Sequence, residues 1–164
     1  MSAFDETDLK LRGFQGFKTF RELDLLDVPA DPGVYAVVRD PDSVHVVLER
    51  SVGGRFKQKD PTGDPNLLRE RLKCDAQTLY IGKADAGSSG KRGLRKRIGE
   101  FVRFGQGEPV GHWGGRYIWQ LSDSQDLRIA WLPVTDGSAK KAEVVLFDEF
   151  YANYTQLPFA NFRR

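Results

Sequence analysis

The chain has 164 residues and a formal net charge of only +2 at neutral pH, so it is long enough to bury one hydrophobic core. No apolar run approaches the roughly 18 residues of a membrane span, and the acidic N-terminus lacks the basic-then-apolar order of a signal peptide. A single cysteine, Cys74, excludes an intramolecular disulfide and a cysteine-cluster zinc site. We expect a globular, cytoplasmic protein that does not enter a membrane.

The first part of the chain predicts an extension followed by a β-hairpin. Residues 1–31 show no strand period, and their spaced phenylalanines indicate an N-terminal extension that packs on the domain. A β-branched and aromatic run predicts a strand from Gly33 to about Arg39. Val44–Glu49 is a second strand candidate, and the turn residues between the two runs favour a hairpin.

The remaining elements alternate between helices and strands. Apolar spacing, N-cap residues and turn residues set their limits. Helices are expected over 66–73, 94–104, 116–121 and 139–154, and strands over 78–82 and 126–134. This order predicts a mixed α/β domain, of the α+β kind, whose sheet has an antiparallel component.

The segment from Lys91 to Arg103 carries six basic residues against one acid, Glu100. Such a local positive face can attract a polyanion although the whole chain is nearly neutral. The alternative is a solvated helix face. We expect nucleic-acid contacts, made to phosphates rather than bases, from Lys91, Arg92, Arg95, Lys96 and Arg103.

Two short strings, Gly33–Tyr35 (Gly-Val-Tyr) and Leu79–Gly82 (Leu-Tyr-Ile-Gly), each place a tyrosine in a run typical of a buried strand. Arg97 in the basic helix, a carboxylate in the last helix and a C-terminal Asn161 follow in that order. The set resembles the GIY-YIG nuclease superfamily, which includes homing endonucleases, the incision subunit of bacterial excision repair and some type II restriction enzymes.

The resemblance covers roughly residues 32–162. It implies a GIY-YIG-like catalytic domain over 32–164, built on a small central antiparallel β-sheet flanked by helices, with insertions at about 40–77 and 84–93. It also implies these catalytic side chains: Tyr35, Tyr80, Lys83, Arg97, Glu149 and Asn161.

The last helix offers two carboxylates, Glu143 and Glu149. Glu149 precedes Pro158 by nine residues and Asn161 by twelve, which are the spacings of the excision-repair branch, and Glu143 reproduces neither. Glu149 also falls on a stripe with apolar neighbours. We therefore expect Glu149 to be the ligand of Mg2+ or Mn2+, with waters and a phosphate oxygen completing the shell.

The other residues suit phosphodiester hydrolysis. Arg97 offers a charged planar fork for phosphate oxygens. Tyrosine is a poor base at a pKa of about 10, so we expect Lys83, Arg97 and the metal ion to lower that pKa until Tyr35 or Tyr80 can orient or deprotonate water. The amide of Asn161 can hold a tyrosine, a water or a backbone group.

One position departs from the family pattern. Several members carry a histidine or tyrosine one helical turn after the arginine, where it assists catalysis, and here that position is Phe101. His112, in the glycine-rich turn that follows, is the secondary candidate for the missing proton-transfer group. A structural or merely exposed histidine is the alternative.

The sequence thus predicts a divalent-metal-dependent endonuclease that hydrolyses DNA. Two alternatives are an endoribonuclease with the same chemistry and a non-catalytic nucleic-acid-binding module that retains the fold. Specificity would come from the insertions, from a homodimer or from a partner protein. A catalytic role requires Tyr35, Tyr80, Arg97 and Glu149 to converge on one concave, positively charged surface.

Overall fold

A four-stranded antiparallel sheet runs through residues 2–163, the part of the chain that the computed structural model describes. The strand order is β1-β4-β2-β3, so β2 lies inside the sheet and β3 forms one edge. Every strand pair is antiparallel. The strands are β1 (Gln15–Thr19), β2 (Gly33–Val38), β3 (Thr78–Ala84) and β4 (Arg128–Pro133).

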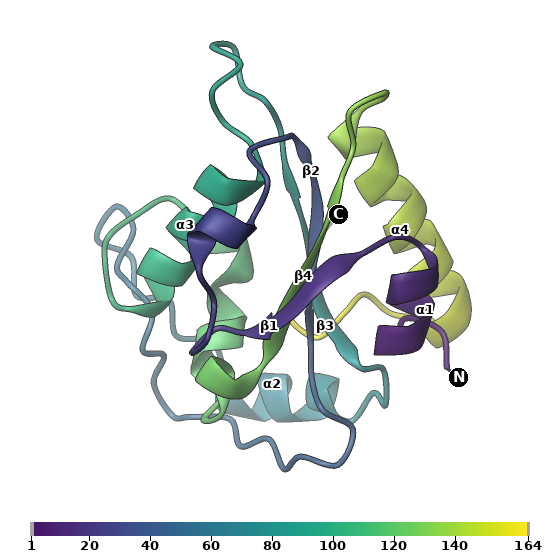
Figure 1. Cartoon of the computed structure of the whole chain (residues 1–164). Helices are drawn as coiled ribbons and strands as arrows, with labels where there is room; N and C mark the ends of the chain where they lie inside the picture. The colour runs from purple at the N-terminus through teal and green to yellow at the C-terminus, as the bar shows by residue number, and fades with distance from the viewer. Residues whose placement is uncertain (1, 164) are drawn as a thin grey trace.

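Helices cover both faces of this sheet, as Figure 1 shows. Helices α1 (Glu6–Leu11) and α4 (Ala139–Tyr154) lie on one side, and α3 (Leu94–Gly105) lies on the other with the 3₁₀ segment η2 (Trp113–Gln120). The short helix α2 (Pro65–Leu72) completes the α3 side.

Strand alternation divides the core into two clusters. Tyr35 and Val37 of β2 point into the cluster that contains α3, whereas Val34 and Ala36 point into the cluster that contains α4. All six residues of β2 are buried, because a central strand covered on both faces exposes neither of its side-chain rows. The motif tyrosine Tyr35 is therefore held rigidly on the α3 side.

The helices begin where the sequence predicts them. Ser138 caps α4 by accepting a hydrogen bond from the Lys141 amide, and Asp64 caps α2, whose first residue is Pro65. These are ordinary N-terminal signals, since a short polar side chain satisfies a free amide and proline needs none. The predicted mixed α/β class with antiparallel pairing is confirmed.

Two predictions about strands are wrong. Val44–Glu49 forms no strand with β2, and only a single bridge joins Val47 to Leu121. Both edges of β2 are occupied, by β3 and by β4, so no hairpin partner can pair there. In addition, the N-terminal extension supplies β1, whose period is hidden by a bulge where Gly16 and Phe17 have positive φ.

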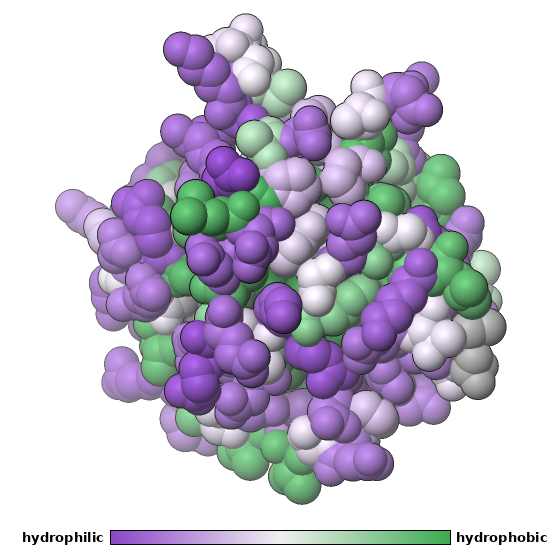
Figure 2. All heavy atoms as spheres, viewed as in Figure 1, coloured by the Kyte–Doolittle hydropathy of each residue, from purple (hydrophilic) through white to green (hydrophobic). Residues whose placement is uncertain are grey.

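The face of the molecule drawn in Figure 2 is mostly hydrophilic, with hydrophobic side chains in small separate patches. Within residues 2–163, no helix has the length and apolar character needed to cross a membrane.

Candidate active site

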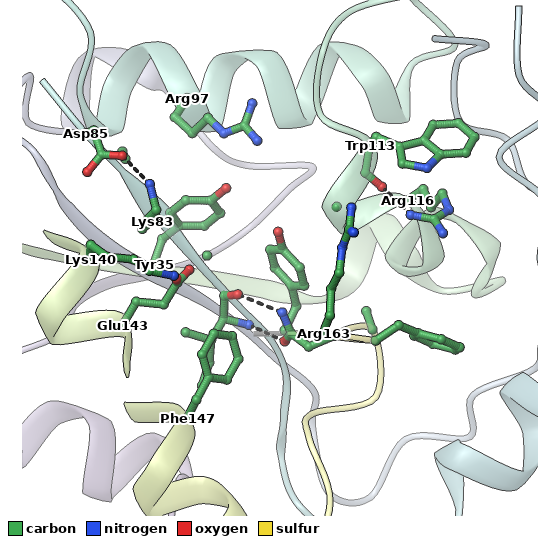
Figure 3. Close-up of a pocket in the computed structure, with 18 of the residues that line it drawn as sticks. Tyr35, Lys83, Asp85, Arg97, Trp113, Arg116, Lys140, Glu143, Phe147 and Arg163 are labelled. Atoms are coloured by element: carbon green, nitrogen blue, oxygen red, sulfur yellow. Dashed lines mark hydrogen bonds and ion pairs between the residues drawn. The ribbon is translucent and has the colours of Figure 1, made fainter. Parts of the chain in front are cut away.

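A cleft of about 700 Å³ lies beside the edge strand β3. Its walls come from segments far apart in the sequence: β2, β3, the start of α3, η2, the first half of α4 and the C-terminal segment 160–163. Figure 3 shows these side chains pointing toward a common space.

The cleft is strongly cationic. Among the described residues that line it, six lysines and arginines face two carboxylates, Asp85 and Glu143. A concave surface with this balance concentrates anions such as phosphate esters. The basic residues are Lys83, Arg92, Arg97, Arg116, Lys140 and Arg163.

Tyr35 and His112 form a hydrogen bond beneath the cleft. Tyr35 Oη lies 2.6 Å from His112 Nε2, and both side chains are fully buried. The other ring nitrogen, Nδ1, has no hydrogen-bond partner among the described residues. Tyr35 is therefore the partner that sets which ring nitrogen carries the proton.

The imidazole of His112 stacks on Phe101, with ring centroids 4.2 Å apart and planes 15° from parallel. The turn thus brings His112 into contact with Phe101, a ring that cannot itself transfer a proton. A glycine makes room for it, because a Cβ on Gly115 would lie 2.8 Å from both His112 Cε1 and Phe101 Cε1.

The glycine of the second motif, Gly82, also makes room for a neighbouring ring. Gly82 is the register partner of Tyr35 across β2 and β3, and a Cβ there would lie 2.5 Å from Tyr35 Cζ. The Tyr35 ring therefore lies across the backbone of Gly82. The Tyr80 ring is next to it, with centroids 6.1 Å apart, so the two motif tyrosines are neighbours as expected.

Burial determines the protonation of these groups. It raises the pKa of Tyr35 well above its usual value and the pKa of Tyr80 to about 12, although the charge of Arg97 acts in the opposite direction. Burial, followed by the charge of Arg97, lowers the pKa of His112 well below 6.5. Burying each phenolate costs more than the charge of Arg97 returns, so Arg97 alone does not bring either tyrosine pKa below its usual value.

Arg97 connects the basic helix to the histidine turn. Its guanidinium Nη1 donates a 2.5 Å hydrogen bond to the carbonyl of Gly111, the residue before His112. The side chain lines the cleft and is 27% exposed. Figure 3 shows it projecting from α3 over the same space as Tyr35 and Lys83. Arg97 thus lies with the tyrosines, as the sequence predicts.

Glu149 is not in the cleft, so the expected convergence is wrong at this residue. It is exposed on α4 and forms an ion pair with Arg12. Glu143 lines the cleft instead and is 8% exposed. Its carboxylate lies 3.5 Å from Lys140 Nζ, and burial raises its pKa although Lys140 opposes the shift.

The error comes from the face assigned to α4. The stripe that contains Glu149 also contains Val145 and Asn153, and both are exposed. The stripe that is actually buried is offset by one position along α4 from the predicted stripe. It consists of Ala139, Glu143, Leu146, Phe147 and Phe150. Both stripes have helical spacing, and the run of four consecutive apolar residues, Val144 to Phe147, supplies apolar positions to either face.

The donors in the cleft fit a divalent cation that keeps much of its hydration shell. No cluster of three or more metal-ligating side chains is found between residues 2 and 163. Magnesium is nevertheless often held by one or two carboxylates with waters and substrate phosphates. Glu143 is a largely buried carboxylate whose pKa is raised by that burial, and a cation beside it would compensate the cost.

Asn161 pairs with the edge strand. Its amide oxygen accepts from the Ile81 amide at 2.9 Å, and its amide nitrogen donates to the Ile81 carbonyl at 2.9 Å. Of the three partners that the sequence allows for Asn161, the structure shows a backbone group. The residue closes the free edge of β3 beneath the cleft and so fixes the strand that carries Tyr80.

Four of the five basic residues predicted to contact nucleic acid lie together on one side of α3 and the preceding loop, and the fifth, Lys91, is exposed in that loop. A shallow hollow there is lined by Arg92, Arg95, Lys96 and Arg103 among others. Three of them have partners within the protein: Arg92 pairs with Glu100, Arg95 donates to the Val28 carbonyl, and Arg103 pairs with Glu108. Lys83, in the main cleft, pairs with Asp85.

Sequence reasoning weighed Glu143 and chose Glu149 instead, and it did not single out Lys140 or Arg163. Lys140 and Glu143 form an i, i+3 pair at the start of α4, a spacing that could have indicated a shared face. Trp113, Arg116 and Arg163 line the cleft from η2 and the C-terminal segment. Residue spacing carries little signal for these, since their position depends on how the turn and the terminus fold back.

Comparison with known proteins finds no matching family model, no similar curated protein and no similar solved structure. The site therefore has to be interpreted from its own geometry.

Proposed function

We propose that the chain is a divalent-metal-dependent endonuclease that hydrolyses DNA phosphodiester bonds with a site like that of GIY-YIG nucleases. One observation carries the proposal: Tyr35, Tyr80, Arg97 and Glu143, from four separate elements, line one cationic cleft. Packing alone gives no reason for a buried carboxylate, an arginine and two tyrosines to meet there. A phosphodiester and its metal ion give each of them a task.

Arg97 suits the scissile phosphate, because its charge is permanent and its planar donors match phosphate oxygens. Lys83 and Lys140 add positive charge around it. Such preorganised charge stabilises the transition state more than the ground state, because negative charge grows on the phosphoryl oxygens as the leaving oxygen departs.

Tyr35 and His112 suit the handling of the attacking water. In the free site both tyrosine hydroxyls are protonated and His112 is neutral, so the imidazole is the group that can accept a proton. A proton leaving the water can pass to Tyr35 Oη while the Tyr35 proton passes to His112 Nε2, 2.6 Å away. Tyr80 lies nearer the opening, being 5% exposed against none for Tyr35, and can orient the water.

Glu143 would hold the metal ion, since Glu149 is not among the residues that line the cleft and is paired with Arg12. When bound, Mg2+ or Mn2+ would supply charge neutralisation at the phosphate and the leaving oxygen.

A cleavage assay tests the proposal. Supercoiled plasmid, linear DNA and RNA of the same sequence are incubated with the protein in Mg2+ or Mn2+, and with excess chelator. We expect DNA cleavage that requires the metal and is lost in Arg97→Ala. Preferential RNA cleavage would show that the substrate is RNA and that the chain is an endoribonuclease. Retained DNA binding with no cleavage of either polymer would identify a non-catalytic binding module.

A further inference from the structure

One wall of the cleft is built from aromatic rings and an arginine. We call it the aromatic wall and define it as Trp113, Arg116, Tyr117 and Phe162, all of which line the cleft. Figure 3 shows Trp113 and Arg116 across the cleft from Lys140 and Glu143. The wall therefore faces the catalytic groups rather than belonging to them.

Arg116 is fixed between two rings. Its guanidinium carbon lies 4.5 Å from the Trp113 ring centre and 4.4 Å from that of Tyr117. Its nitrogens donate to the Trp113 carbonyl and to Tyr117 Oη, both at 2.9 Å. With these donors engaged, Arg116 acts less as a phosphate clamp than as a rigid plate that holds the rings in place.

Phe162 extends this stack and is held in the same way. Its ring lies 4.6 Å from the Tyr117 ring and 4.3 Å from the Arg71 guanidinium carbon. Arg71 in turn donates to the carbonyls of Pro158, Phe159 and Asn161 at 2.7–2.9 Å. Phe162 is nevertheless 41% exposed. A clamped ring thus presents part of its surface to solvent beside Asn161.

Simple core packing does not account for this arrangement. Trp119, from the same 3₁₀ segment, is fully buried and belongs to the core. Trp113 and Tyr117 are only half-buried, and they lie at the core margin where the cleft opens. Exposed rings within a cationic cleft are the combination that binds nucleobases, since the charges attract the backbone and the rings stack on the bases.

We infer that the aromatic wall receives an unpaired nucleobase, so that the chain prefers substrates with a single-stranded or unpaired nucleotide near the scissile phosphate. The inference rests on the proposed nuclease function and specifies its substrate class. Bases inside a duplex hide both ring faces in the stack, and only a nucleotide outside the stack can offer one. The wall lies across the cleft from Lys140 and Glu143 (Figure 3), so a backbone bound beside those groups can present an adjacent extruded base to it.

Binding of three DNA substrates tests this inference. One is fully paired, one has a single unpaired 2-aminopurine in an otherwise identical duplex, and one is single-stranded. Binding is measured with chelator present, so that cleavage plays no part. We expect wild-type protein to bind the unpaired substrates more tightly and to quench 2-aminopurine fluorescence as the base stacks.

The variants Phe162→Ala, Phe162→Trp and Leu67→Ala separate stacking from other effects. Leu67 is 47% exposed on α2 and is outside the cleft lining. Losing a stacking ring should weaken binding of unpaired substrates by roughly 5- to 150-fold and should alter duplex binding by less than about twofold. Phe162→Trp should retain binding and quenching, and Leu67→Ala should behave as wild type.

Equal losses on all three DNAs, or no loss, would overturn the inference while leaving the nuclease proposal intact. Quenching and unpaired-base preference without any cleavage would overturn the nuclease proposal and leave base stacking in place.

Discussion

Tyr35 Oη and His112 Nε2 are hydrogen-bonded at 2.6 Å although 77 residues separate them in the chain. The bond joins the central strand to the turn after α3, and Arg97 holds that same turn through the Gly111 carbonyl. A buried tyrosine with a neutral imidazole as partner can transfer a proton without leaving the protein interior. Under the proposed function, this pairing would supply the proton acceptor that Phe101 cannot be.

Removal of either partner should slow cleavage. For Tyr35→Phe and His112→Gln we expect losses of about 10²- to 10⁴-fold in kcat, as for general acid–base groups. Because the two act as one unit, the double variant should be no slower than the worse single variant. Single-turnover rates measure this, with circular dichroism to check folding. Losses that multiply in the double variant would show that the two residues act independently.

The two glutamates of α4 form a matched pair for testing the metal site. Glu143→Gln should abolish Mn2+ binding and cleavage, because it removes the one buried carboxylate among the described residues of the cleft. Glu149→Gln should retain both and lose only the ion pair with Arg12, worth at most about 1 kcal/mol of folding stability at an exposed site. Calorimetric Mn2+ titration gives a measure that does not depend on activity. Normal Mn2+ binding by Glu143→Gln would contradict the assignment.

His112 should make the folded state sensitive to acid. Its pKa is lowered in the folded protein by burial and by Arg97, and its other close polar neighbours are the tyrosines Tyr35 and Tyr80. Below pH 6.5 the unfolded chain takes up a proton that the folded chain refuses, so stability falls as the pH falls toward the folded pKa. The slope approaches about 1.4 kcal/mol per pH unit.

Urea unfolding between pH 5 and 8 measures this dependence. The difference in unfolding free energy between wild type and His112→Gln should shrink as the pH falls below 6.5. Only in wild type does the unfolded state gain stability by protonating His112. A pH-independent difference would show that His112 is protonated in the folded state as readily as in the unfolded state.

Asn161 should matter for stability as well as for activity. Asn161→Ala leaves the amide and carbonyl of Ile81 without their partners in a buried setting, at a cost of about 1–3 kcal/mol per group. Asn153 is a control on α4, because its side chain is exposed and, within residues 2–163, its one hydrogen bond is to the Glu149 carbonyl. Asn153→Ala should change stability by less than about 0.5 kcal/mol. Equal effects in thermal unfolding would mean that the edge-strand pairing contributes little.

The sequence predicts local features well and long-range ones unevenly. Caps and apolar spacing place α2, α3 and α4 almost residue by residue, because these signals act within a few positions. The bulged strand β1 and the unpaired segment Val44–Glu49 depend on which strands flank β2, and no local pattern encodes that.

The site shows the same division. The motif tyrosines and Arg97 meet as predicted, because strand register and helix phase fix their directions. The choice between Glu143 and Glu149 fails because α4 carries two overlapping apolar stripes that are offset by one position along the chain. Tertiary packing buries the stripe that faces β3, and that stripe contains Glu143.

The basic surface of α3 should bind DNA through phosphates, and its lysines should carry most of this effect. Arg92, Arg95 and Arg103 are engaged within the protein, whereas Lys96 is exposed beside them and, among residues 2–163, makes no ion pair. Lys96→Ala should therefore weaken binding to all DNA sequences alike and should reduce the slope of log affinity against log salt by about one unit. Lys18→Ala removes the same charge from β1, at the opposite edge of the sheet from β3, and should leave the slope unchanged. Fluorescence anisotropy at several salt concentrations measures both slopes. Equal slopes for the two variants would show that the α3 surface is only a solvated helix face.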